Sequence, residues 1–72
     1  MTDYELAIIN FLRASPETAY SRKEISRKAV RRQEFEENPD WVRAPLAALI
    51  ARGIVEVDNA GYYKFRKRVD GL

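Results

Sequence analysis

The stretch 41–65 constrains the fold of this chain more than any other segment does. Its first part repeats apolar residues at spacings of four, three and one, which places them on one face of a helix: Val42, Leu46, Leu49 and Ile50. Gly53 follows at the position where a left-handed residue often ends a helix, and Arg52 suits the negative end of the helix dipole. The segment therefore predicts a helix that stops at Gly53.

After Gly53 the period of the apolar residues changes to two. Two short runs alternate between apolar and charged side chains, which predicts two β-strands: Val55-Glu56-Val57 and Tyr63-Lys64-Phe65. The residues between the runs, Asp58-Asn59-Ala60-Gly61, favour a turn because Asn and Gly tolerate positive φ. The expected unit is therefore a helix, a glycine and a β-hairpin.

Two more helices are predicted upstream, each opened by a capping box. Thr2 with Glu5 begins the first helix, which should stop before Ser15-Pro16 because the residue before a proline is pushed out of the helical region. Ser21 with Glu24 begins the second helix.

A third helix is predicted to begin at Asn38-Pro39-Asp40, with the asparagine as N-cap and Trp41 in the first turn. Pro45 should kink this helix, unless the helical part begins near Ala44. A very short strand at 19–20 is expected to pair with the hairpin.

These features resemble the winged helix-turn-helix family. Many members carry a helix of the form V-x-x-x-L-x-x-L-x-x-x-G-[IL]-[IV], which is matched by Val42, Leu46, Leu49, Gly53, Ile54 and Val55. The pattern S-x-x-E-I-x-x-x-[AL] from Ser21 is similar to the first helix of the helix-turn-helix pair. The resemblance implies an α+β fold in which three helices are followed by a β-hairpin wing. We expect a single domain over residues 1–72, with an ordered core at about 3–66 and a frayed tail at 69–72.

The expected core collects the inward-facing apolar positions of these elements: Leu6, Ile9, Leu12, Ile25, Ala29, Val42, Leu46, Leu49, Ile54, Val57, Tyr63 and Phe65. A chain of 72 residues buries only about 60% of the surface that its unfolded form exposes, so we expect one core and modest stability.

Charge is segregated along the chain, although its net value is only +2. Residues 22–32 carry six basic side chains against one glutamate, a balance of +5. Residues 34–40 carry four carboxylates, a balance of −4, and residues 64–68 carry four basic side chains, a balance of +4. The acidic segment lies between Ala29 and Val42, where the chain is longer than the family pattern. This segregation indicates partner surfaces of defined charge.

Several function classes have no support in the composition. The chain has no cysteine and no histidine, which removes the thiolate nucleophile, the commonest general base and the commonest metal ligand. We therefore expect no enzyme activity, no cofactor and no metal. No apolar run approaches the length of a membrane span and no signal pattern opens the chain, so we expect a cytoplasmic protein without membrane contact.

The resemblance implies binding to double-stranded DNA. Basic or aromatic side chains at the positions that reach DNA in the family are the candidate contacts: Arg22, Lys23, Arg27, Arg31, Arg43, Tyr62, Lys64 and Arg66. The first four share the second helix by near-helical spacing and suit phosphate contacts. Arg43 is the best candidate for a base edge, since Ala44 and Ala47 offer no hydrogen bonds. Lys67 and Arg68 would extend the last strand along phosphates, and useful affinity would need a homodimer or larger assembly.

A protein-interaction domain is the alternative. Phe35, Glu36, Glu37 and Trp41 would form that interface, because the acidic segment puts negative charge where DNA should lie. Trp41 also suits the core, where it would pack on Phe35. Both interpretations of Trp41 stay open from the sequence.

Overall fold

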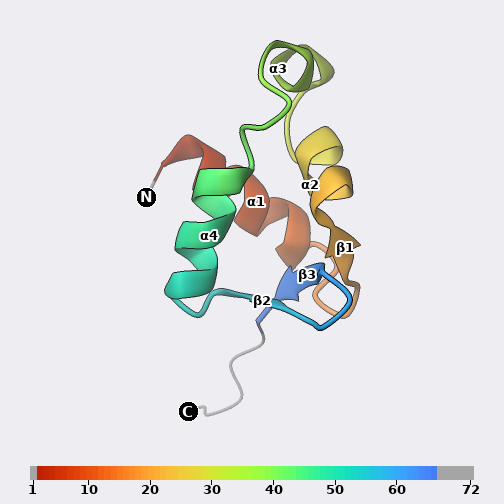
Figure 1. Cartoon of the computed structure of the whole chain (residues 1–72), viewed down its shortest axis with the longest axis vertical. Coiled ribbons are helices and arrows are strands. Elements are labelled where there is room, and N and C mark those ends of the chain that lie inside the picture. The colour runs from red at the N-terminus through yellow and green to blue at the C-terminus, as the bar shows by residue number, and fades with distance from the viewer. Residues whose placement is uncertain (1, 67–72) are drawn as a thin grey trace.

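The computed structural model describes residues 2–66, so the expectations for Lys67, Arg68 and the tail 69–72 lie outside the described residues. Within this range the chain is a small α+β structure of four helices and a three-stranded antiparallel sheet (Figure 1). The helices are α1 (Asp3–Arg13), α2 (Arg22–Lys28), α3 (Arg32–Glu37) and α4 (Arg43–Ala51), and the strands are β1 (Tyr20–Ser21), β2 (Val55–Val57) and β3 (Tyr62–Phe65).

The sheet has the strand order β1-β3-β2. The hairpin register pairs Val55 with Phe65 and Val57 with Tyr63, while Tyr20 of β1 pairs with Tyr63 from the other side. β1 is the short strand expected to pair with the hairpin, one residue later in the chain than predicted. Because side chains alternate across a strand, these five apolar residues share one face of the sheet.

Local capping sets the ends of the first two helices as the sequence predicts. Glu5 N–H donates to Thr2 Oγ1 at 3.1 Å and Thr2 N–H donates to Glu5 Oε1 at 2.9 Å, which completes the capping box of α1. Ser21 and Glu24 form the same reciprocal pair at the start of α2. α1 ends at Arg13, before Ser15-Pro16.

Gly53 ends α4 in the predicted left-handed conformation, with φ of 77°. The Gly53 N–H donates to the Ile50 carbonyl and the Ile54 N–H donates to the Leu49 carbonyl, each at 3.0 Å. This pair of bonds is a Schellman motif, which satisfies carbonyls that the helix end leaves open. The hairpin turn also forms as expected, with Gly61 at φ of 85°.

α4 begins later than predicted. Asn38 caps the C-terminal end of α3, and Trp41 N–H donates to the Asn38 carbonyl at 3.1 Å within a turn. The first residue of α4 is Arg43, so Pro45 is its third residue. Helix N–H groups in the first turn have no intrahelical acceptor, so the proline removes no bond there. The prediction of an N-cap at Asn38 was wrong, and the alternative of a start near Ala44 is correct.

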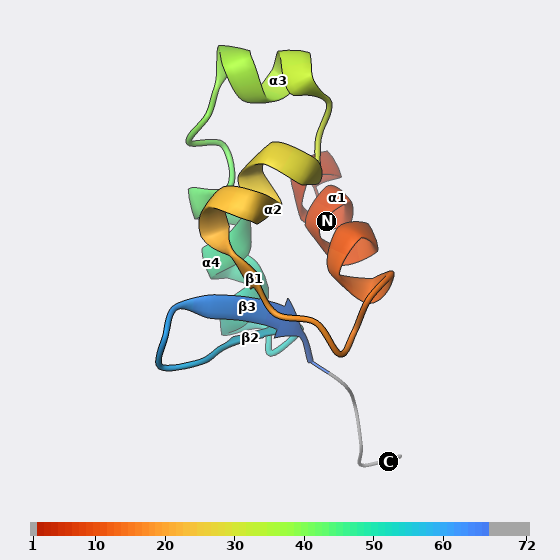
Figure 2. The same ribbon diagram turned by 90° about the vertical axis from the view of Figure 1, so that its right-hand side faces the viewer.

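The extra segment between α2 and α4 forms a helix of its own, so the expected count of three helices was one too few. α3 has six residues, and none of them is buried. It lies at the end of the molecule farthest from the sheet (Figure 2), joined to α2 by a bend and to α4 by the turn that contains Trp41.

The core lies where α1, α2 and α4 meet above the sheet, and it consists of Ile8, Leu12, Ile25, Trp41, Val42, Leu46, Leu49 and Val55. Ile9, Ala29, Ile54, Tyr63 and Phe65 pack against it as half-buried residues. Leu6 and Val57 were wrongly expected inside, since each is 44% exposed. The buried face of α1 instead follows Glu5, Ile8 and Leu12. Val57 is the last residue of β2, where the hairpin extends beyond the helices (Figure 2).

None of the helices in residues 2–66 has the length and apolar character needed to cross a lipid bilayer.

Replacing Gly53 tests whether the left-handed C-terminal residue of α4 stabilises the fold. We expect Gly53→Ala to lower the free energy of unfolding by roughly 1–2 kcal/mol, because a Cβ disfavours positive φ. Gly53→Asn should lower it less, since asparagine tolerates this conformation. Urea unfolding followed by far-ultraviolet circular dichroism measures both. Equal stability of the alanine variant and the parent would contradict this role.

Candidate nucleic-acid interface

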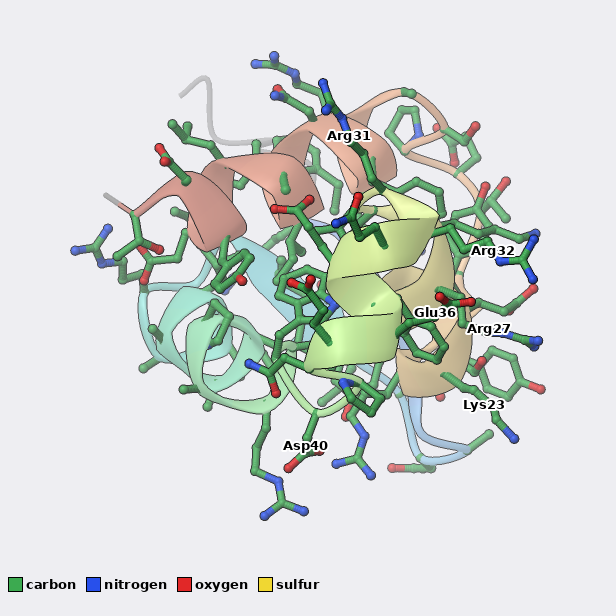
Figure 3. The ribbon with its side chains drawn as sticks, turned by 90° about the horizontal axis from the view of Figure 1, so that it is seen from above. Lys23, Arg27, Arg31, Arg32, Glu36 and Asp40 are labelled. Carbon is green, nitrogen blue, oxygen red and sulfur yellow. The ribbon has the colours of Figure 1, made fainter. Side chains whose placement is uncertain are left out.

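The outer face of α2 carries two of the candidate cations. Lys23 and Arg27 are four residues apart, so they lie one helical turn apart on the same face. Both side chains are exposed, and neither forms an ion pair within residues 2–66. Figure 3 shows them pointing outward along one edge of the molecule, together with Arg32 from α3. We name Lys23, Arg27 and Arg32 the basic edge.

Arg32 was not among the candidate residues. Its Nε donates to Glu36 Oε2 at 3.0 Å, in a pair whose side chains are 90% and 60% exposed. Exposed pairs of this kind stabilise a fold by about 0–1 kcal/mol, so Arg32 can exchange this partner for a phosphate at little loss. The basic run 22–32 was the one sequence signal that included this residue, and it did not indicate that Arg32 would lie beside Lys23 and Arg27.

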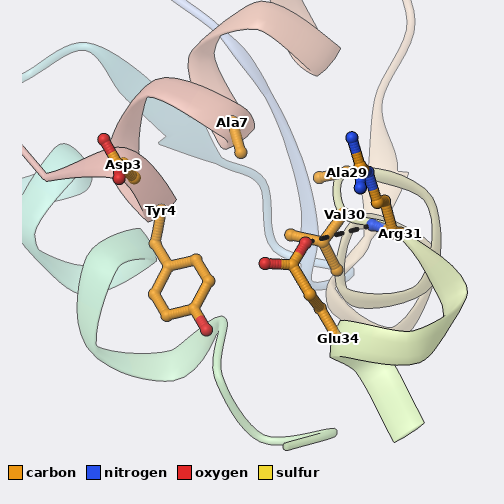
Figure 4. A pocket seen from close by; sticks show the side chains of 7 residues that line it. All are labelled: Asp3, Tyr4, Ala7, Ala29, Val30, Arg31 and Glu34. Atoms are coloured by element: carbon orange, nitrogen blue, oxygen red, sulfur yellow. Dashed lines mark hydrogen bonds between the residues drawn. The ribbon is translucent and has the colours of Figure 1, made fainter. Parts of the chain in front are cut away.

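Arg31 was expected to continue the face of Lys23 and Arg27, and this prediction was wrong. α2 ends at Lys28, and Arg31 is the extended N-cap residue of α3. Its side chain lies away from the basic edge (Figure 3). Arg31 instead borders a hollow of about 420 Å³ between α1 and α3, where its backbone N–H donates to Glu34 Oε1 at 3.4 Å (Figure 4). Because the helix is interrupted after Lys28, Arg31 does not lie one further turn along the face of Lys23 and Arg27.

The outer face of α4 offers few groups that could read a base. Arg43 is exposed, but its Nε lies 3.8 Å from Asp40 Oδ2. Ala44, Ala47 and Ala51 make up the rest of the exposed face. An alanine can touch a thymine methyl group but cannot form the hydrogen bonds that distinguish base pairs. Arg43 is therefore the single basic candidate on this helix, and it already has a carboxylate neighbour.

The outer side of β3 supplies the remaining candidates. Tyr62 is 44% exposed, and Lys64 lies beside Tyr62 on the same face by strand alternation. Lys64 Nζ is 3.8 Å from Glu56 Oε2 on the neighbouring strand β2. Arg66 follows the strand, is exposed, and donates its backbone N–H to the Ile54 carbonyl at 2.8 Å. This face is thus less positive than the sequence suggested, because a glutamate accompanies the lysine.

Arg22 lies at the start of α2, where it borders a groove together with Lys23 and Phe35. The structure therefore brings together Arg22, Lys23 and Arg27 on one helix. It leaves Arg43 beside Asp40 and Lys64 beside Glu56. Charge neighbours of this kind depend on side-chain positions that residue spacing does not reveal.

Trp41 belongs to the core and not to an exposed interface. It is 4% exposed, and its indole Nε1 donates to the Ser26 carbonyl at 2.9 Å. Its ring lies against Tyr4, with ring centroids 4.8 Å apart, and not against Phe35 as expected. Ser26 is buried as well, and its hydroxyl donates to the Pro39 carbonyl at 2.8 Å. The two bonds join α2 to the segment that enters α4, and we name them the Ser26 clasp.

Among the described residues, no three histidine, cysteine, aspartate or glutamate side chains gather closely enough to hold a metal ion. Comparison with known proteins adds no assignment: no family model, no curated protein and no solved structure matches the chain.

The Ser26 clasp should be a main contributor to stability. We expect Trp41→Phe to lower the free energy of unfolding by about 2 kcal/mol, because it leaves the Ser26 carbonyl without its donor and removes buried volume. Ser26→Ala should lower it by about 1 kcal/mol, since the exposed Pro39 can turn its carbonyl to water. Tyr4→Phe is the matched control, because it keeps the ring contact. Urea unfolding measures all three, and a Trp41→Phe variant as stable as the control would contradict the clasp.

Proposed function

We propose that this chain is a winged helix-turn-helix domain. The proposal draws support from the order of elements, α1-β1-α2, then α4-β2-β3, and from the sheet order β1-β3-β2. In this reading α2 and α4 are the helix pair, the hairpin β2-β3 is the wing, and α3 is an insertion in the turn between the two helices. Asp58 to Gly61 make the wing tip only four residues long.

We further propose that the domain binds double-stranded DNA mainly through phosphates. The observation that carries this proposal is the basic edge, where Lys23 and Arg27 are exposed and have no carboxylate partner within residues 2–66. Phosphate neutralisation by such cations releases counterions and supplies affinity without sequence information. Arg22 at the start of the same helix adds a third cation. Lys64 and Arg66 on the wing side add weaker contacts.

Base readout should be weak under this proposal. The outer face of α4 is built from alanines, and Arg43 has Asp40 beside it. Single DNA-binding modules bury about 600–1,000 Å² and depend on combination with others for tight binding. A homodimer or a larger assembly would therefore supply the affinity that one small domain lacks.

A second candidate function is protein binding through α3. The observation that favours it is that α3 stands at the far end of the molecule with no buried residue (Figures 1 and 2). Glu34, Glu36 and Glu37 are all exposed there. A folded but exposed acidic helix suits a basic protein surface and opposes a phosphate backbone.

A fluorescence-anisotropy titration with a random-sequence duplex tests DNA binding. We expect the association constant of the parent chain to fall steeply between about 50 and 200 mM salt, with a log–log slope of about −0.9 for each phosphate neutralised. The double variant Lys23→Glu/Arg27→Glu should lose at least about tenfold in affinity, and its slope should be shallower by about 2.

The matched control for that titration is Arg13→Glu/Arg52→Glu, which changes the net charge equally at exposed positions outside the basic edge. Circular dichroism confirms that each variant folds. No binding by the parent at about 50 mM salt with micromolar protein would refute the DNA proposal for the isolated chain. Equal losses in the two double variants would show that only net charge matters.

Neutralising α3 separates the two candidate functions. We expect Glu36→Gln/Glu37→Gln to tighten duplex binding by several-fold, because it removes two negative charges near the basic edge and frees Arg32. The same titration measures this effect, with Asp3→Asn/Glu17→Gln as the charge-matched control, since both residues are exposed and lie outside the basic edge. Unchanged DNA affinity, together with loss of a protein complex in a pull-down, would favour the protein-binding function.

A further inference from the structure

A groove of about 370 Å³ lies beside the Ser26 clasp, where the first turn of α2, Phe35 of α3 and the segment that leads into α4 meet. Its apolar lining consists of half-buried Phe35, exposed Pro39 and buried Val42. This volume lies in the lower part of the range of about 300–1,000 Å³ that ligand sites occupy. The groove is therefore large enough for the side chains of a short peptide segment.

The rim of this groove is unevenly charged. Arg22 and Lys23 border it from α2, and neither forms an ion pair within the part of the chain that the structure describes. Asp40 borders the opposite side, but its carboxylate lies 3.8 Å from Arg43 Nε. The rim thus offers two unpaired cations against one carboxylate that has a cation beside it, which favours an anionic occupant.

Phe35 connects this groove to a second hollow. It is the only apolar residue of α3, and its other side borders a hollow of about 380 Å³ that is lined also by Arg27, Arg32 and Glu36. Basic side chains therefore line both of the hollows that Phe35 borders. Aromatic residues and arginine are enriched at protein interfaces, so this half-buried phenylalanine suits contact with a partner.

We propose that the groove binds a short acidic peptide of another protein. An apolar side chain of the peptide contacts Phe35 and Val42, and flanking carboxylates face Arg22 and Lys23. A DNA backbone fits this site less well, because phosphates and sugars supply no large apolar group for the apolar lining. The proposal is independent of DNA binding, although Lys23 would serve both partners.

The test is an NMR titration of the full ¹⁵N-labelled chain with the peptide acetyl-Glu-Leu-Glu-Glu-amide. We expect saturable shifts of the amides of Lys23, Phe35 and Val42, with a Kd on the order of 1 mM. The peptides acetyl-Gln-Leu-Gln-Gln-amide and acetyl-Glu-Gly-Glu-Glu-amide should each bind at least about tenfold more weakly. The first lacks the carboxylates that face Arg22 and Lys23, and the second lacks the apolar side chain that contacts Phe35 and Val42.

Two variants test this site against the DNA surface. Of these, Phe35→Ser makes the separation, since it should weaken peptide binding about tenfold and leave duplex binding unchanged. Arg22→Gln/Lys23→Gln should weaken peptide and duplex binding together, and it keeps the peptide test valid if Phe35→Ser unfolds. Lys28→Gln is the control, since it lies on the same helix but does not border the groove. Absence of saturable shifts up to about 10 mM peptide would overturn the proposal. Shifts of the Phe35 and Val42 amides with a duplex but not with the peptide would overturn it as well. The proposal would also fail if the same amides shifted on dilution of the protein without peptide, because a second copy of the chain would then occupy the groove.

Discussion

One buried serine holds together the two helices on which the rest of this small structure depends. Ser26 donates its hydroxyl to the Pro39 carbonyl and accepts the indole N–H of Trp41 at its own carbonyl. A domain of this size has little apolar surface to bury, so satisfying two polar groups inside the core matters more than it would in a larger protein. The clasp also brings Trp41 under Tyr4, which closes the core on the side away from the sheet.

Local signals predicted the parts of the fold that are decided within a few residues. The two capping boxes, the glycine end of α4 and the hairpin turn each depend on bonds between near neighbours in the chain, and all formed as expected. The start of α4 was misplaced because Trp41 bonds to Ser26, fifteen residues earlier. No periodic pattern reports such a contact. α3 escaped prediction for a different reason, since it has only Phe35 to show an apolar face.

The candidate site was predictable only where helix geometry alone decides it. Lys23 and Arg27 share a face because four-residue spacing on a helix requires it, and the capping box at Ser21 showed where that helix begins. The same reasoning gave a wrong position for Arg31, because α2 ends at Lys28. The carboxylate neighbours of Arg43 and Lys64 follow from the turn that places Asp40 three residues before Arg43 and from the hairpin register that pairs Glu56 with Lys64, and neither was used in the prediction. Counting the basic residues in the sequence therefore overestimates the number of unpaired cations on the surface.

The position of the clasp has a consequence for how such a chain can evolve. Ser26 and Trp41 fix the two ends of the segment that contains α3. The number of residues in this segment can therefore change without disturbing the contact between α2 and the start of α4. Doubling a closed loop adds only about 0.6 kcal/mol of entropy cost. The fold should therefore tolerate added length in residues 30–38, and this segment is a natural place to graft a foreign epitope without redesigning the scaffold.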